Sequence, residues 1–124
     1  MSRSRASAKS AGTRMETLVA WHLSDALDDD RIERRAKNGA KDRGDIANVR
    51  TALGERVVIE CKDYGGRLMP GPWVQEAHTE AGNDDAAVGV VVAKRRGTTR
   101  PGDQWVLMTL DDLAVLLGGK REEQ

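Results

Sequence analysis

Apolar residues recur at two different spacings along the chain, and each spacing predicts a different kind of element. Between Thr13 and Leu27 they return every three or four positions, which predicts an amphipathic helix. Thr13 is followed three residues later by Glu16 in a capping-box pattern, so we expect the helix to begin there. Residues 1–12 are dominated by Ser, Ala, Gly and basic side chains, and they predict a flexible basic arm.

Two runs of β-branched residues predict buried strands. Residues 57–62 (VVIECK) and 88–93 (VGVVVA) are almost continuously apolar, as strands covered on both faces should be. The remaining predicted elements are short strands at 31–35, 45–49 and 105–109, and helices at 73–81 and 110–117.

The order of these elements predicts the fold class. Three consecutive strands predict an antiparallel meander, and the helix that follows provides a crossover, so the next strand should pair in parallel. We therefore expect an α/β fold with a mixed central sheet flanked by helices. A chain of 124 residues suits one domain, which we assign to residues 13–124.

Composition narrows the setting in which the protein works. Cys61 is the single cysteine, which excludes an internal disulfide and is compatible with a reducing cytoplasm. No apolar run approaches the roughly 18–20 residues that span a bilayer, and the basic N-terminus lacks the apolar segment of a secretory signal. These features predict a cytoplasmic protein, in a bacterium or a phage-infected host, with no membrane partner.

Charge is segregated along the chain although the formal net charge is zero. Basic residues gather at 1–14, 31–43 and 94–100, while acidic residues gather elsewhere, so one face of the molecule should be positive. A positive face attracts phosphate, although solvated surface charge is the alternative for each cluster. The candidate DNA-binding residues are Arg34, Arg35, Lys37, Lys41, Arg43, Lys94, Arg95 and Arg96.

The candidate chemistry lies at the end of the 57–62 strand. Glu60 and Lys62 are two positions apart, so their side chains share one face of the strand, while Cys61 points to the other. The meander should bring Asp45, which follows Gly44 at the start of a short strand, beside Glu60. Two converging carboxylates repel, and a charged group near a core is costly unless it is paired or binds metal.

A magnesium ion relieves this repulsion. Mg²⁺ prefers oxygen ligands, so Asp45, Glu60 and the backbone carbonyl of Cys61 are the candidate ligands, and Mn²⁺ should substitute for it. Such a metal activates water and stabilises the charge that develops on a phosphate during cleavage. Lys62, close to the same metal, is the candidate catalytic lysine. No small-molecule cofactor is expected.

Asp45 and the Glu60-Cys61-Lys62 triplet resemble the signature of the PD-(D/E)XK nuclease superfamily, with Gly44 where that signature has proline. The resemblance implies the restriction-endonuclease-like core, helix–three strands–helix–strand, which agrees with the order read from the pattern. It also implies an acidic residue on the first helix that faces the site. Glu16 is the candidate for this accessory acid, and its alternative role is the capping box.

Within that superfamily, residues 13–93 are most similar to archaeal-type and phage Holliday junction resolvases. The shared order is the helix glutamate, an arginine strand (Arg34 or Arg35), a basic glycine loop at 37–43, the aspartate and the ExK strand. The resemblance implies a homodimer that makes paired cuts in four-way DNA junctions during recombination or repair. It also implies a polar residue near Lys62, for which Gln75 is the candidate accessory residue.

Two other functions remain open. One is a different nuclease of this type, acting on flaps, mismatches or restriction sites. The other is a catalytically silent DNA-binding accessory protein. Cleavage of junctions compared with flapped and linear DNA separates the first, and the absence of metal-dependent cleavage identifies the second.

Overall fold

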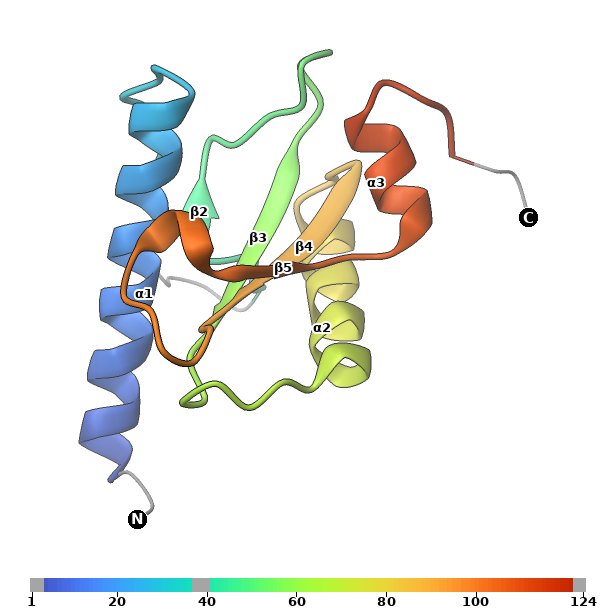
Figure 1. Ribbon diagram of the computed structural model, residues 1–124. Helices are drawn as coiled ribbons and strands as arrows, with labels where there is room; N and C mark the ends of the chain where they lie inside the picture. The colour runs from blue at the N-terminus through green and yellow to red at the C-terminus, as the bar shows by residue number, and fades with distance from the viewer. Residues whose placement is uncertain (1–3, 37–40, 122–124) are drawn as a thin grey trace.

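The first helix begins well before the predicted position. The structure, a computed structural model, describes residues 4–36 and 41–121, and α1 spans Arg5–Ala26 (Figure 1). The side chain of Ser4 caps this helix by accepting a hydrogen bond from the Ser7 amide at 3.1 Å. The predicted start at Thr13 is therefore wrong, and residues 5–12, predicted as a flexible arm, are helical.

The extension of α1 has a physical cause in its sequence. Alanine is the strongest helix former, and Ala6, Ala8 and Ala11 lie in the added turns. Ala11 is also buried, so packing supports this part of the helix. Thr13 and Glu16 consequently lie inside α1, and no capping box forms between them.

The central sheet has three strands in the order β3–β4–β5. β3 (Val57–Lys62) and β4 (Val88–Ala93) have the bounds that the sequence predicted, and they pair in parallel through the crossover helix α2 (Pro70–Asn83). β5 (Trp105–Leu107) follows the short helix η1 (Pro101–Asp103) and pairs antiparallel to β4. The prediction of a mixed sheet flanked by helices is confirmed.

The predicted continuous meander is wrong. β1 (Glu33–Arg34) and β2 (Ile46–Ala47) form a separate two-stranded antiparallel sheet. Two backbone hydrogen bonds attach the β2 segment to β3, from the Asp45 amide to the Ile59 carbonyl at 2.8 Å and from Val57 to Val49 at 3.0 Å. The 45–49 segment thus runs beside β3, but it bonds at its two ends instead of forming a full ladder.

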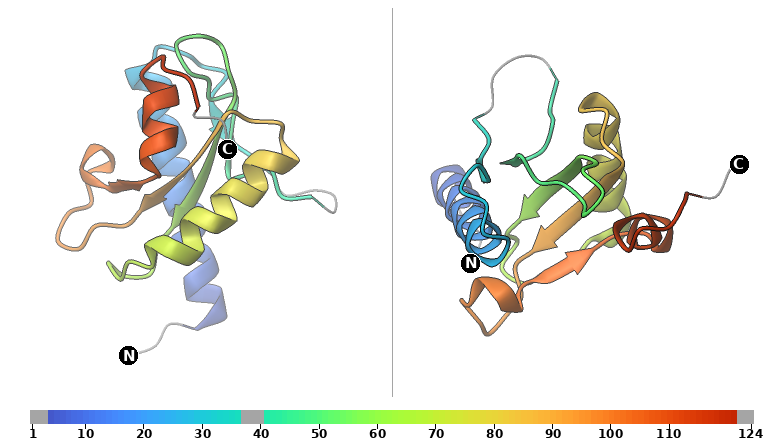
Figure 2. Two further views of the ribbon diagram at one scale, coloured as in Figure 1. Left: turned by 90° about the vertical axis from the view of Figure 1, so that its right-hand side faces the viewer. Right: turned by 90° about the horizontal axis from the view of Figure 1, so that it is seen from above.

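Helices cover both faces of the three-stranded sheet. One apolar cluster packs α1 and α3 (Leu110–Leu116) against the face that carries Ile59, Cys61 and Val90. A second cluster packs Trp73 and Ala77 of α2 against the opposite face, and Figure 2 shows α2 and α1 on different sides of the sheet. Since side chains alternate along a strand, Val58, Glu60 and Lys62 face α2.

The α2 helix lies unusually close to β4. A Cβ atom at Gly89 would lie 2.6 Å from the carbonyl oxygen of Ala77, so only glycine allows this approach. Buried Asp112 of α3 accepts hydrogen bonds from the Gly89 amide at 3.0 Å and from Arg121 at 2.6 Å. Within the described residues, no helix has both the length and the apolar character that crossing a membrane requires.

Candidate functional site

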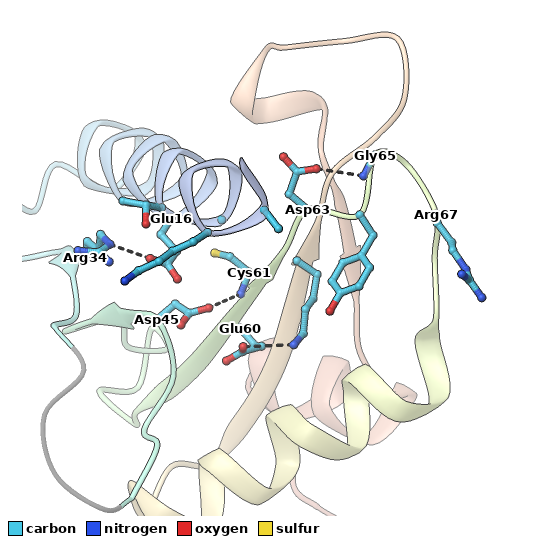
Figure 3. Close-up of a pocket in the computed structure, with 14 residues that line it drawn as sticks. Glu16, Arg34, Asp45, Glu60, Cys61, Asp63, Gly65 and Arg67 are labelled. Carbon is cyan, nitrogen blue, oxygen red and sulfur yellow. Dashed lines mark hydrogen bonds and ion pairs between the residues drawn. The ribbon is translucent and has the colours of Figure 1, made fainter. Parts of the chain in front are cut away.

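A cavity of about 830 Å³ opens between α1 and the edge of β3 (Figure 3). Its wall combines the N-terminal half of α1, the two short strands and the C-terminal end of β3 with the loop that follows. Four of the sequence-predicted residues with proposed chemistry meet here. Its polar and charged lining includes Lys9, Glu16, Arg34, Asp45, Glu60, Lys62, Asp63 and Arg67.

Asp45 is held against β3 by the backbone on both sides of it. Its carboxylate Oδ2 accepts a hydrogen bond from the Cys61 amide at 2.8 Å, and Asp45 is 2% exposed. Gly44 precedes it with a φ of 90°, and a Cβ there would lie 2.9 Å from a methyl group of Val58. Glycine is therefore needed before Asp45, because the chain must pass this close to β3.

Glu60 is buried at the same end of β3. It is 5% exposed, and one carboxylate oxygen lies 3.5 Å from the Lys62 ammonium. Its other oxygen, Oε2, is buried and has no hydrogen-bond partner among the residues that the structure describes. Burial raises the pKa of Glu60, and the positive charge of Lys62 opposes this shift.

Lys62 is held in the cavity by contacts with two carboxylates. Its ammonium lies 2.7 Å from a carboxylate oxygen of Glu76 on α2, and its side chain is 13% exposed. Burial alone would lower the pKa of Lys62, but the contacts with Glu76 and Glu60 outweigh burial and raise it. The side chain therefore carries a full positive charge at neutral pH and points along the same face as Glu60.

Glu16 faces the cavity from α1. Its carboxylate Oε2 accepts a hydrogen bond from the Arg34 guanidinium at 2.7 Å (Figure 3). The helix glutamate and one of the two predicted arginines are thus brought together across 18 residues of sequence. The alternative role of Glu16 in a capping box is wrong, because it lies in the interior of α1.

Cys61 points away from Glu60 and Lys62, as predicted, and toward α1. Its side chain belongs to the apolar cluster beneath α1, and burial raises the pKa of its thiol well above the usual range. The thiol is therefore protonated and chemically quiet. Along β3, Val57, Ile59 and Cys61 direct their backbone groups toward the β2 segment, which puts the Cys61 carbonyl on the strand edge beside Asp45.

The other predicted DNA-binding residues are dispersed around the molecule. Arg35 is half-buried with its guanidinium 3.7 Å from Asp84, while Lys41 and Arg43 are exposed. Lys37 lies outside the described residues. The structure therefore brings only Arg34 of the candidates up to residue 43, as far as it describes them, to the cavity.

The 94–96 cluster is partly engaged in internal contacts. Lys94 donates hydrogen bonds to the backbone carbonyls of Arg95 and Thr98. The Arg95 guanidinium lies 4.3 Å from the ring centre of Trp105 in a cation–π contact, and Arg96 reaches the Gly65 carbonyl at 3.5 Å. Arg95 and Arg96 are nevertheless exposed, so their charge faces solvent.

Several residues in and around the cavity were not predicted from the sequence. Arg67 adds positive charge to its wall, as does Lys9, which belongs to the basic cluster predicted at residues 1–14. Glu76 holds Lys62, whereas Gln75, the predicted neighbour of Lys62, is exposed and is not part of the cavity lining.

Glu80 is the most informative residue that the sequence analysis missed. It is 3% exposed and lies on the buried side of α2 with Trp73, Ala77 and Ala81. Burial, followed by contact with Glu60, raises the pKa of Glu80 to about 10. An acidic residue in the apolar stripe of a helix is a recognisable signal, because burying such a group has a free-energy cost.

Comparisons with known proteins do not identify the chain. A scan against protein-family models and searches of curated proteins and of solved structures found no match.

Proposed function

We propose that this protein is a metal-dependent DNA nuclease of the PD-(D/E)XK type that resolves four-way junctions. The observation that carries the proposal is that Asp45, Glu60 and the charged Lys62 line one open cavity at the end of β3, with Lys62 3.5 Å from Glu60. The element order α1–β1–β2–β3–α2–β4 supports a restriction-endonuclease-like core.

The donor set fits a hard divalent cation. Asp45 and Glu60 are buried carboxylates, and Oε2 of Glu60 is buried without a hydrogen-bond donor in the described part of the chain. Asp45, Glu60 and the Cys61 carbonyl would hold Mg²⁺, and Mn²⁺ would replace it. When bound, the metal lowers the pKa of a coordinated water and neutralises charge on the phosphate.

The protein supplies the positive charge around the cleaved phosphate. Lys62 is held as a cation by Glu76 and Glu60, so it offsets negative charge that grows in the transition state. Arg34 is 41% exposed and is anchored by Glu16 at the cavity wall, where its guanidinium can bind a phosphate oxygen. Glu16 then acts as a positioning residue for Arg34.

The shape of a four-way junction suits a homodimer. A junction has approximate two-fold symmetry and needs two paired cuts, which two equivalent sites related by a two-fold axis deliver. Lys9 and Arg67 add positive charge at the cavity wall, and Lys41 and Arg43 are exposed elsewhere on the surface. Contacts of this kind read the path of the phosphate backbone and weaken with salt.

Cleavage of labelled DNA tests the proposal. A four-way junction, a flap and a linear duplex are incubated with the protein in Mg²⁺, alongside Asp45→Asn and the control Asp25→Asn, which changes an exposed acid on α1. We expect paired junction cuts that Asp45→Asn reduces about a hundredfold or more and Asp25→Asn leaves unchanged. Cleavage of flaps or duplexes alone would contradict the resolvase assignment and indicate another nuclease of this type. DNA binding without cleavage would indicate an accessory protein.

A further inference from the structure

Three carboxylates meet on the α2 side of Glu60. Asp42 comes from the segment before β2, Glu60 from β3 and Glu80 from α2, and one carboxylate oxygen of each lies within 4.8 Å of the others. We call this set the Asp42–Glu60–Glu80 cluster. It does not contain Asp45, which bonds to the Cys61 amide on the outer edge of β3.

Two of these carboxylates are buried with oxygens that receive no hydrogen bond. Glu60 and Glu80 are 5% and 3% exposed, and Oε2 of each has no donor among the described residues. An uncompensated buried oxygen costs on the order of 1–3 kcal/mol, and ionising both carboxyl groups at once would add like-charge repulsion to this cost. The other members of the cluster are carboxyl groups, so the cluster supplies ligand atoms, and Lys62, 3.5 Å from Glu60, is the one cation in contact with it that the described residues show.

The backbone holds the cluster in place. The side chain of Asn83 donates a hydrogen bond to the Asp42 carbonyl at 2.9 Å, which ties this segment to the end of α2. The Gly44 amide donates to Asp42 Oδ1, also at 2.9 Å. Asp42 itself is exposed, so the cluster is open to solvent on one side and closed on the other by Glu60 and Glu80.

We propose that Asp42, Glu60 and Glu80 form a second binding site for a hard divalent cation such as Mg²⁺ or Mn²⁺. Three carboxylates give an all-oxygen donor set, and water on the exposed Asp42 side completes the coordination shell. Glu60 is shared with the proposed nuclease site, so a cation in the cluster fixes the side chain that both sites need. Cation binding in the cluster does not itself depend on the nuclease proposal.

The alternative occupant is a proton. Burial and contact with Glu60 raise the pKa of Glu80, and a proton shared between Glu80 and Glu60 would stabilise the cluster without metal. Direct measurement of cation binding separates these two states.

Manganese binding to the DNA-free protein tests the second site. Free aquo-Mn²⁺ is measured by electron paramagnetic resonance in the Asp45→Asn chain, which removes the other proposed site, so the remaining binding reports the cluster. We expect Asp45→Asn to retain Mn²⁺ binding and added Glu80→Gln or Asp42→Asn to weaken it at least about tenfold. Mg²⁺ should compete with Mn²⁺. Added Glu55→Gln, which changes an exposed glutamate outside the cluster, should have no effect.

Unchanged Mn²⁺ affinity after Glu80→Gln, or no binding by the Asp45→Asn chain, would overturn the second site. Circular dichroism checks that each variant is folded, and Asp42→Asn decides the outcome if Glu80→Gln does not fold, since Asp42 is exposed. Cleavage assays test the nuclease proposal separately. Mn²⁺ binding without cleavage would contradict only the nuclease proposal. Cleavage without Mn²⁺ binding to the cluster would contradict only the second site.

Discussion

The two faces of β3 differ sharply although they alternate along six residues. Ile59 and Cys61 face α1 and α3 in an apolar cluster, whereas Glu60 and Lys62 face α2 among acidic residues. Burial on the first face stabilises the fold, because apolar surface leaves water. Burial on the second face is costly, because charged groups leave water. The cost of the charged face is an argument for the proposed role of this face in binding or chemistry.

Truncating the apolar face should have the largest effect on stability. Ile59 is 4% exposed in the apolar cluster, so Ile59→Ala leaves a cavity and should lower the free energy of unfolding by about 2–5 kcal/mol. Urea denaturation measures this change. A loss below about 1 kcal/mol would show that this face is not the main stabilising region.

Removing the cation of the charged face should instead affect cleavage. Lys62→Met keeps most of the side-chain volume but removes the ammonium beside Glu60 and Glu76, so junction cleavage should fall about a hundredfold. Single-turnover cleavage measures the rate, and Lys120→Met, which changes an exposed lysine near the C-terminus, is the control. Equal rates for Lys62→Met and the wild type would exclude Lys62 from the chemistry.

The Glu16–Arg34 pair should contribute a smaller effect at the cavity wall. Glu16→Gln removes the charge that anchors the Arg34 guanidinium, so the rate of cleavage should fall about tenfold while the fold is retained. Cleavage rates of the single and double variants distinguish positioning of Arg34 from a direct role of Glu16. If Glu16 positions Arg34, Arg34→Gln should abolish the further effect of Glu16→Gln, and additive losses in the double variant would contradict positioning.

Neutralising Glu80 should stabilise the metal-free protein slightly. Its pKa is about 10 in the folded state and near 4.5 in an ordinary environment, so folding requires proton uptake between these values and wild-type stability falls as pH rises through this window. Glu80→Gln should therefore be more stable by at least about 1 kcal/mol at pH 8 in EDTA, with little difference at pH 4. Thermal denaturation at both pH values measures this.

The opposite sign at pH 8 would show that ionised Glu80 contributes favourable contacts in the folded state. Added Mn²⁺ sharpens the same comparison. In the Asp45→Asn chain, which lacks the other proposed site, a cation that binds the folded cluster should stabilise the protein by mass action, and added Glu80→Gln should remove most of this stabilisation.

Long apolar patterns in the sequence predicted the sheet well, because the β-branched runs at 57–62 and 88–93 leave few alternatives to a buried strand. The start of α1 was not predicted correctly. The capping-box pattern at Thr13 and Glu16 competes with the simpler cap at Ser4, and the burial of Ala11 favours the longer helix. Local signals alone do not decide between two caps when tertiary packing stabilises one of them.

The candidate site was predicted in part for a related reason. The shared location of Asp45, Glu60 and Lys62 was predictable, because strand alternation and chain order can be read from the sequence, and all three residues line the cavity. The contacts of Lys62 with Glu76 and of Glu60 with Glu80 depend on how α2 packs across the sheet. That packing is a property of the tertiary structure, and its one sign in the sequence is the position of Glu80 in the apolar stripe of α2.

The close packing of α2 on the sheet depends on Gly89 of β4. Because a Cβ at this position would lie 2.6 Å from the Ala77 carbonyl, any other residue must push α2 away from the sheet. Val58 pairs with Gly89 across the ladder, and Glu60 lies two residues further along β3. A substitution there would retract Glu76 and Glu80 from their partners without touching a charged group. The contacts of Glu76 and Glu80 with β3 therefore depend on the absence of a side chain at Gly89, because this absence sets the distance between α2 and the sheet.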